Sequence, residues 1–184
     1  MLSREESLAL LHSQVKNKNL IKHMLAAEAV MGRLADYLGE DRELWSRTGL
    51  LHDLDYDRTA KDPENHGLLG AQMLEERGCP AALVQAVRSH NPALGQERAT
   101  LLDKALYAVD PVTGLLVAAA LVHPEKKLAA LDVDFVMKRF GEKAFARGAN
   151  RDQIRACSEL GLSLRDFIAL SLEAMQSISE DLGL

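Results

Sequence analysis

Apolar residues recur every three to four positions along almost the whole chain, and no stretch alternates cleanly between apolar and polar residues. Because one face of an α-helix recurs every 3.6 residues, this periodicity predicts helices, whereas half-buried strands need a period of two. The pattern therefore predicts an all-α protein. The most regular stripe stops at Gly39 and comprises Leu20, Met24, Ala27, Met31, Leu34 and Leu38.

Prolines, glycines and capping residues divide the chain into further helices. Asp62 and Pro63 are typical of a helix start, and Pro80 is expected to open the next helix in the same way. Pro111 is expected to interrupt or kink a helix, because proline lacks the amide hydrogen that the helix needs. We expect helices over about residues 20–38, 41–54, 63–78, 80–90, 100–122, 132–140, from 150 onward, and 163–179.

The chain has 184 residues, a length typical of one domain with its own hydrophobic core. It contains no internal repeat, no low-complexity tract and no linker rich in glycine, serine or proline. We therefore expect residues 1–184 to form a single-domain helical bundle.

The net charge, the cysteines and the apolar runs limit the binding partners and the cellular location that we expect. The net charge is −5 with interspersed acids and bases, which argues against DNA binding but allows a local basic pocket for a phosphate. Cys79 and Cys157 are too few for a disulfide framework, so we expect reduced thiols. The N-terminus lacks the order of a secretory signal, and the longest apolar run, residues 115–122, is far shorter than the ~20 residues of a membrane span. We expect a cytoplasmic protein without membrane binding.

The apolar faces of the expected helices carry titratable residues. His52, for example, shares a helix face with Trp45, Thr48 and Leu51. Burying one such group costs little when it finds a partner, but burying several without partners is costly. A divalent metal can satisfy them together, because imidazole nitrogen and carboxylate oxygen are ligands for Zn, Fe, Mn or Ni. The candidate ligands are His23, His52, Asp53, His66, His90 and Asp110.

A structural role is the simpler interpretation of these residues taken one at a time. A single core histidine is more often hydrogen-bonded to a backbone carbonyl than bound to a metal, and a His-Asp pair is common by chance. The order is more specific: a histidine, a His-Asp pair, two further histidines and an aspartate, each at the inner edge of a helix. Outside this order, we expect His12 to lie on the surface or in packing and His123 to cap a helix end.

Three stretches contain the first histidine, the His-Asp pair and the final aspartate of this order. They are KHMLAAEAVM with His23, GLLHDLDYD with the His52-Asp53 pair, and ALYAVD with Asp110. Together they resemble the His…His-Asp…Asp motif of the HD-domain superfamily of metal-dependent phosphohydrolases, specifically its small HDIG-type members. His66 in DPENHGLLGA and His90 in VRSHNP match the two extra histidines of the family's dinuclear branch. The resemblance covers residues 20–121, so we expect an HD metal-binding core there and a C-terminal helical extension, residues 122–184, packed on it.

The resemblance implies a cofactor and a reaction. A metal-activated hydroxide would attack the phosphorus of a small phosphate monoester or nucleotide, with His52 and Asp53 as the catalytic residues. The metal would be Fe, Mn, Ni, Co or Zn, as one ion or two. One ion would be held by His23, His52, Asp53 and Asp110. A second ion would share Asp53 and be completed by His66 and His90.

One part of the motif departs from the family. HDIG-type sequences often continue the doublet with Ile-Gly-Lys, whereas this chain places Asp55 and Tyr56 where the glycine and lysine stand. If the lysine holds substrate phosphate in relatives, either another side chain does so here or the substrate differs. Arg58 and Lys61 are the best candidates for a replacement, because they follow the doublet on a loop. Asp55 and Asp57 are candidates for orienting histidine ligands, and turn formation explains them about as well.

Two other functions stay open at this point. The same six-ligand site suits a di-iron oxygenase of the same fold, and iron-rich, coloured protein that is inert on phosphate esters would favour it. A metal-stabilised regulatory or binding module without turnover is the second, although a complete ligand set counts against it. The sequence does not determine the substrate, the metal or the oligomeric state.

Overall fold

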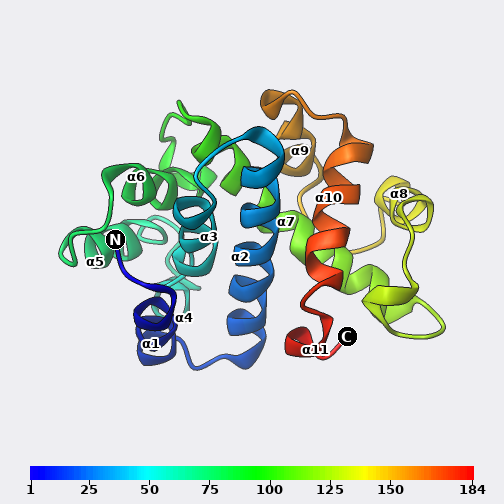
Figure 1. The fold of residues 1–184 in the computed structure, drawn as a ribbon, viewed down its shortest axis with the longest axis horizontal. Coiled ribbons are helices and arrows are strands. Elements are labelled where there is room, and N and C mark those ends of the chain that lie inside the picture. The colour runs from blue at the N-terminus through cyan, green and yellow to red at the C-terminus, as the bar shows by residue number, and fades with distance from the viewer.

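The computed structural model describes residues 1–184 and contains helices, turns and loops without a strand. The predicted all-α fold is therefore confirmed (Figure 1). Three short 3-10 helices are η1 Pro92–Leu94, η2 Leu128–Ala130 and η3 Ala156–Leu160. The α-helices are α1 Arg4–Gln14, α2 Lys18–Leu38, α3 Arg42–Leu51, α4 Tyr56–Thr59, α5 Leu68–Glu75, α6 Ala81–Ser89, α7 Leu101–Val122, α8 Val133–Gly141, α9 Arg151–Arg155, α10 Leu164–Gln176 and α11 Ser179–Leu182.

The two longest helices begin and end where the sequence supplies capping groups. The Asn17 side chain accepts hydrogen bonds from two backbone amides at the start of α2, and the helix ends at Gly39 with a φ of 75°. α7 begins with a capping box between Thr100 and Asp103. Side-chain caps therefore fix the starts of both helices, and Gly39 fixes the end of α2.

The helix predicted from Pro63 begins later, at Leu68, as α5. The chain before it forms turns and passes through Gly67 at a φ of 87°. The physical reason is Asp55, whose buried carboxylate accepts the backbone amides of Gly67 and Gly70, each at 2.8 Å. A side chain from another part of the chain therefore caps α5, and local sequence does not show this.

Pro111 was predicted to interrupt or kink its helix. It does not interrupt α7, which runs unbroken from Leu101 to Val122. Proline removes one backbone amide, but most residues of α7 are buried against other helices, and this packing maintains the helix. Asp110 and Thr113 consequently lie on one continuous helix.

Two clusters of buried apolar residues form the core. The larger cluster joins α2 and α7 to α8, α9 and α10, with Leu116 and Phe167 fully buried in it. The smaller joins the first turns of α2 to α1, α3, α5 and α6, with Leu51 and Leu83 fully buried. In Figure 1, α7 crosses behind α2 and α10, and α10 packs directly against both α7 and α2.

α2 and α3 approach each other closely because Gly49 has no side chain. A Cβ at this position would lie 2.5 Å from the carbonyl oxygen of Ala27 on α2. The end of α3 is therefore held directly against the first half of α2.

α7 is long and apolar enough to cross a membrane, judged by length and composition alone. The core helix of a water-soluble protein can meet the same criteria. In α7, 61% of the most apolar window is buried in the structure. The expected absence of membrane binding was based on the short apolar run at residues 115–122, and α7 extends well beyond that run. The absence of membrane binding and the cytoplasmic location therefore stay predictions.

Candidate metal centre

The six candidate ligands come from distant parts of the chain and meet between α2, α3, α6 and α7. We call them the metal centre. They are His23 on α2, His52 at the end of α3, Asp53 directly after it, His66 in the turn before α5, His90 at the end of α6 and Asp110 on α7.

Asp53 lies in the middle of this group. Its Oδ1 is 3.5 Å from Nε2 of His52 and 3.4 Å from Nε2 of both His66 and His90. Its Oδ2 is 3.7 Å from Nε2 of His23. One carboxylate therefore faces all four imidazoles, which is the arrangement that a bridging ligand needs.

Asp110 lies on the side of the centre formed by α2 and α7. Its Oδ1 is 3.3 Å from Nε2 of His23 and 3.9 Å from Nε2 of His52. The ligand atoms of His23, His52 and Asp110 all lie within 4.8 Å of one another, and so do those of His52, Asp53 and His90. These two overlapping triads share His52.

Backbone carbonyls hold two of the imidazoles in place. Nδ1 of His52 is 2.7 Å from the Gly49 carbonyl, and Nδ1 of His90 is 2.6 Å from the Val87 carbonyl. A carbonyl oxygen can only accept, so Nδ1 must carry a proton in both rings. In the neutral imidazole, Nε2 is then an unprotonated acceptor.

Side chains hold the other two imidazoles. Nδ1 of His66 donates to Asp55 Oδ1 at 2.9 Å. Nδ1 of His23 donates to the Thr113 hydroxyl at 2.8 Å, which donates in turn to the Asp110 carbonyl at 3.0 Å. Asp55 makes the contact predicted for an orienting residue. Thr113 was missed, because a threonine in an apolar helix gives no signal until the facing helix is known.

Four Nε2 lone pairs consequently converge in the centre. The Nε2 atoms of His23 and His52 are 3.1 Å apart, and those of His66 and His90 are 3.0 Å apart. Two neutral acceptors this close repel each other unless a proton or a metal cation lies between them. Two nitrogens bound to one ion at about 2.0–2.1 Å, at angles of about 90–110°, would be about 2.9–3.4 Å apart. Both the donor set and its spacing therefore fit divalent metal ions.

Burial and mutual charge set the protonation of the metal-free centre. Burial lowers the pKa of His52 to about 4, so this ring is neutral at physiological pH. Burial also opposes a charge on His90, but its hydrogen bond and charge interaction with Asp53 prevail and raise the pKa to about 9. Burial would raise the pKa of Asp53, yet the surrounding imidazoles hold it well below its usual range. Without a metal, His90 therefore retains a proton beside an ionised Asp53.

The other residues singled out in the sequence lie outside the centre. Arg58 is exposed and donates to Gln14 of α1 at 3.0 Å, and Lys61 is exposed. Their role in substrate binding stays a prediction. Asp57 contacts no histidine of the centre and accepts the backbone amides of Lys16 and Asn17 instead, at 2.7 and 3.3 Å.

The two histidines excluded from the ligand set lie where they were expected. His12 is exposed in the last turn of α1. His123 is the C-terminal cap of α7, and its ring packs against Phe135.

A cavity of about 410 Å³ adjoins the metal centre at His23 and Thr113. Lys22, the apolar side chain of Val117 and the segment from Leu182 to Leu184 also line it. Nζ of Lys22 donates to the Leu182 carbonyl at 2.6 Å and holds this segment against α2. The cavity therefore offers a partly apolar space with a cationic side chain beside the centre.

Comparison with known proteins assigns the chain to a family. Residues 20–120 match the HD domain. The chain therefore belongs to the HD domain family, as the sequence motif predicted. Its clusters of His and Asp are typical of the metal site in the phosphohydrolases of this family.

Among characterised relatives, the chain is similar to several proteins named ribonuclease Y. The protein from Desulfotalea psychrophila is 26% identical over 168 residues, which cover 90% of this chain and 32% of the relative. The one from Nitratidesulfovibrio vulgaris is 30% identical over 100 residues, covering 53% and 18%. The one from Clostridium novyi is 32% identical over 76 residues, covering 40% and 15%. The chain thus spans about a third or less of the length of these relatives.

Proposed function

We propose that this chain is a metal-dependent phosphohydrolase that cleaves a small phosphate monoester or nucleotide. The observation that supports it best is the convergence of four imidazole Nε2 atoms around Asp53, with each Nδ1 held by an acceptor outside the centre. Such a set of acceptors calls for cations, and its order along the chain is that of a family of metal-dependent phosphohydrolases.

In this proposal one divalent transition metal is held by His23, His52, Asp53 and Asp110, and a second by Asp53, His66 and His90. The chemistry supplied by such bound ions is Lewis acidity, which activates water and offsets the charge that gathers on a phosphoryl group in the transition state. The protein's own contribution is orientation. Asp55, Thr113 and two backbone carbonyls fix the imidazole rings, so that their Nε2 atoms need no rearrangement on binding.

The cavity beside His23 supports a small substrate. Its volume of about 410 Å³ lies within the range of about 300–1,000 Å³ usual for small-molecule sites. We assign it to the organic part of the substrate, with the phosphate toward the metal centre. Lys22 lines this cavity and is therefore placed to contact the substrate. Arg58 does not lie on a loop as predicted but in α4, and Lys61 lies in the turn after it; neither lines this cavity.

Metal analysis and turnover test the proposal together. Protein purified without added metal should contain one to two equivalents of transition metal. It should hydrolyse an aryl phosphate or a member of a nucleotide panel when Mn, Ni or Co is added, and stop when a chelator is added. Metal-free protein that stays inactive after reconstitution would contradict the proposal. Full metal occupancy without turnover of any ester would indicate a metal-stabilised binding module instead.

Cleavage of RNA is a second candidate, because the characterised relatives are named ribonuclease Y and one matches 90% of this chain. The net charge of −5 disfavours a long polyanion as substrate. A labelled RNA oligonucleotide assayed beside the monoesters separates the two candidates. Faster cleavage of the oligonucleotide than of any monoester would favour the ribonuclease function.

A di-iron oxygenase is the third candidate, since six His and Asp ligands also suit that chemistry. Its mark would be iron-rich, coloured protein that consumes O2 and leaves phosphate esters intact. Iron content, absorbance and O2 uptake, measured on the sample used for the ester panel, decide between the two enzymes.

A further inference from the structure

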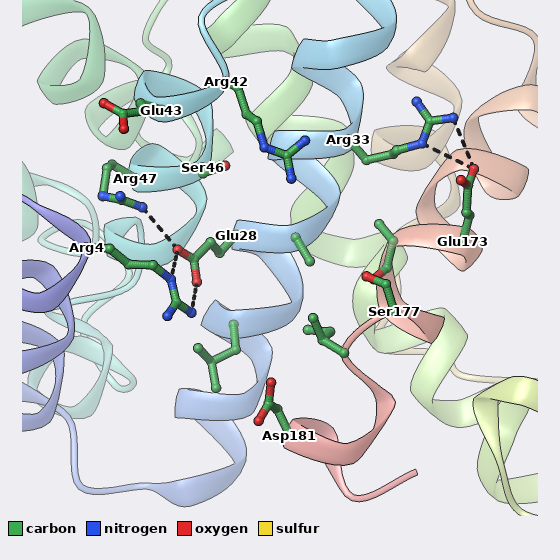
Figure 2. A pocket seen from close by; sticks show the side chains of 14 residues that line it. Arg4, Glu28, Arg33, Arg42, Glu43, Ser46, Arg47, Glu173, Ser177 and Asp181 are labelled. Atoms are coloured by element: carbon green, nitrogen blue, oxygen red, sulfur yellow. Dashed lines mark hydrogen bonds and ion pairs between the residues drawn. The ribbon is translucent and has the colours of Figure 1, made fainter.

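A second polar cavity lies on the opposite side of α2 and α3 from the metal centre. It has a volume of about 530 Å³ and is open to solvent between α1, α2, α3 and α10 (Figure 2). Glu28 follows His23 by five positions on α2, and Arg47 precedes His52 by five on α3. Five residues turn a helix by about 140°, so these side chains face away from the metal centre. We call this the arginine cavity, after its lining residues Arg4, Arg33, Arg42 and Arg47.

The buried part of the arginine cavity has more hydrogen-bond donors than acceptors. Glu28 is the buried acid among the lining residues, and two arginines share it. Arg4 donates to both of its oxygens, at 2.8 and 2.9 Å, and Arg47 donates to Oε1 at 3.2 Å (Figure 2). The other acidic residues of the lining, Glu43 among them, are exposed at the rim. One carboxylate therefore faces two guanidinium groups.

Arg47 has the least satisfied of these guanidinium groups. Its side chain is only 10% exposed, and its sole hydrogen bond is the one to Glu28. Its Nε is buried without any partner. A guanidinium offers five N–H donors, and burying them unpaired is unfavourable. An anion in the cavity would supply an acceptor for the terminal N–H groups of Arg47 that Glu28 leaves unpaired.

Two further arginines of the lining pair with carboxylates that are open to solvent. Arg33 is paired with Glu173, whose side chain is 63% exposed, and Arg42 is paired with Asp36, which is 42% exposed. Ion pairs this open to water contribute little, so an anionic ligand can replace either partner at low cost. Figure 2 shows Arg33 across the cavity from Arg4 and Arg47, with Arg42 between Arg47 and Arg33.

We propose that the arginine cavity binds the phosphate group of a small molecule, at a site separate from the metal centre. The planar guanidinium fork matches phosphate oxygens in pairs, and arginines from three helices surround the space. The volume is that of a small-molecule site and is too limited for a folded partner.

Binding of inorganic pyrophosphate to metal-stripped, desalted full-length protein tests this site. Without metal, the metal centre does not contribute a phosphate site, so failure here is independent of the proposed phosphohydrolase function. We expect a saturable isotherm by calorimetry and a rise in melting temperature beyond that given by KCl of equal ionic strength. Citrate, a polycarboxylate of similar charge, should bind more weakly. Tighter binding of citrate would overturn the assignment to phosphate.

Arg33→Gln and Arg42→Gln are the deciding variants, because both side chains lie partly or largely in solvent and their loss leaves the core intact. Each should weaken pyrophosphate binding by about tenfold or more, the loss expected for one charge-assisted contact. Arg165→Gln is the matched control, since Arg165 is 57% exposed and pairs with Asp134 outside the cavity. Equal binding by all three variants, or no saturable binding by the wild type, would overturn the proposal.

Discussion

The metal centre and the arginine cavity are two polar clusters on the same pair of helices, α2 and α3. The metal centre has an excess of hydrogen-bond acceptors, whereas the arginine cavity has an excess of donors. The metal centre has four imidazole acceptors and two carboxylates facing one another, with Nε2 atoms 3.0–3.1 Å apart. The arginine cavity has two guanidinium groups on one buried carboxylate, with Nε of Arg47 unpaired. The presence of buried charged groups does not by itself distinguish the two sites, because both contain them. The sign of the missing hydrogen-bond partner is what distinguishes a cation site from an anion site.

The largest expected effect comes from removing the carboxylate shared by the metal centre. Asp53→Ala takes away the one group that faces all four imidazoles, so we expect loss of bound metal and of any hydrolysis together. Metal quantification by mass spectrometry and the ester assay measure both. His12→Ala and His123→Ala should change neither. Retention of full metal content by Asp53→Ala would refute the assignment of this centre.

Glu28→Ala tests the arginine cavity in the corresponding way. The change leaves Arg47 buried without a carboxylate, and removing one partner of a buried pair typically costs about 3–5 kcal/mol of folding stability. Urea unfolding measures it, and metal content should not change. Glu173→Ala is the matched control: its pair with Arg33 is 63% exposed on the glutamate side, so the loss should be below about 1 kcal/mol. Equal losses would show that the Glu28 pairs are no more than surface contacts.

A smaller effect is expected from residues that hold the imidazoles rather than the metal. Asp55→Asn weakens the acceptor for Nδ1 of His66 while keeping its shape. Loss of such an orienting contact typically lowers metal affinity about 10–100-fold, measured by competition with a chromogenic chelator. Asp57→Asn serves as control, because Asp57 contacts backbone amides instead of a histidine. The prediction fails if the two variants bind metal equally well.

The last effect concerns pH in the metal-free protein. The pKa of His90 is raised from 6.5 to about 9, so its protonation stabilises the fold fully below pH 6.5 and this contribution is lost as pH rises through about 9. We expect the urea midpoint of metal-free protein to fall over this interval, whereas metal-loaded protein should show no such slope, because a ligated His90 carries no proton. His90→Gln should reduce the slope, and the remainder is expected from His23, where burial opposes a charge but the hydrogen bond to Asp110 prevails and raises the pKa. An unchanged slope in His90→Gln would assign it to another group.

The sequence was sufficient to predict the all-α fold and the six side chains that meet at the centre, because both depend on local pattern and on order along the chain. It did not show the start of α5, since the Asp55 carboxylate that caps Gly67 and Gly70 comes from another turn. Nor did it show Thr113, whose meaning depends on α7 facing His23.

The arginine cavity was beyond the sequence for the same reason. Arg4, Arg33 and Arg47 are spread over three helices and resemble ordinary surface charges until those helices pack around Glu28. Contacts between helices distant in the sequence, rather than helix pattern, decide both features.

A single carboxylate connects the metal centre to the backbone of α5. Asp55 is fully buried and holds the His66 ring with one oxygen and the amides of Gly67 and Gly70 with the other. Any event that tightens His66 therefore also slows hydrogen–deuterium exchange at the first turn of α5. The deuterium uptake of this one peptide would report occupancy of the centre from a helix that supplies no ligand of its own.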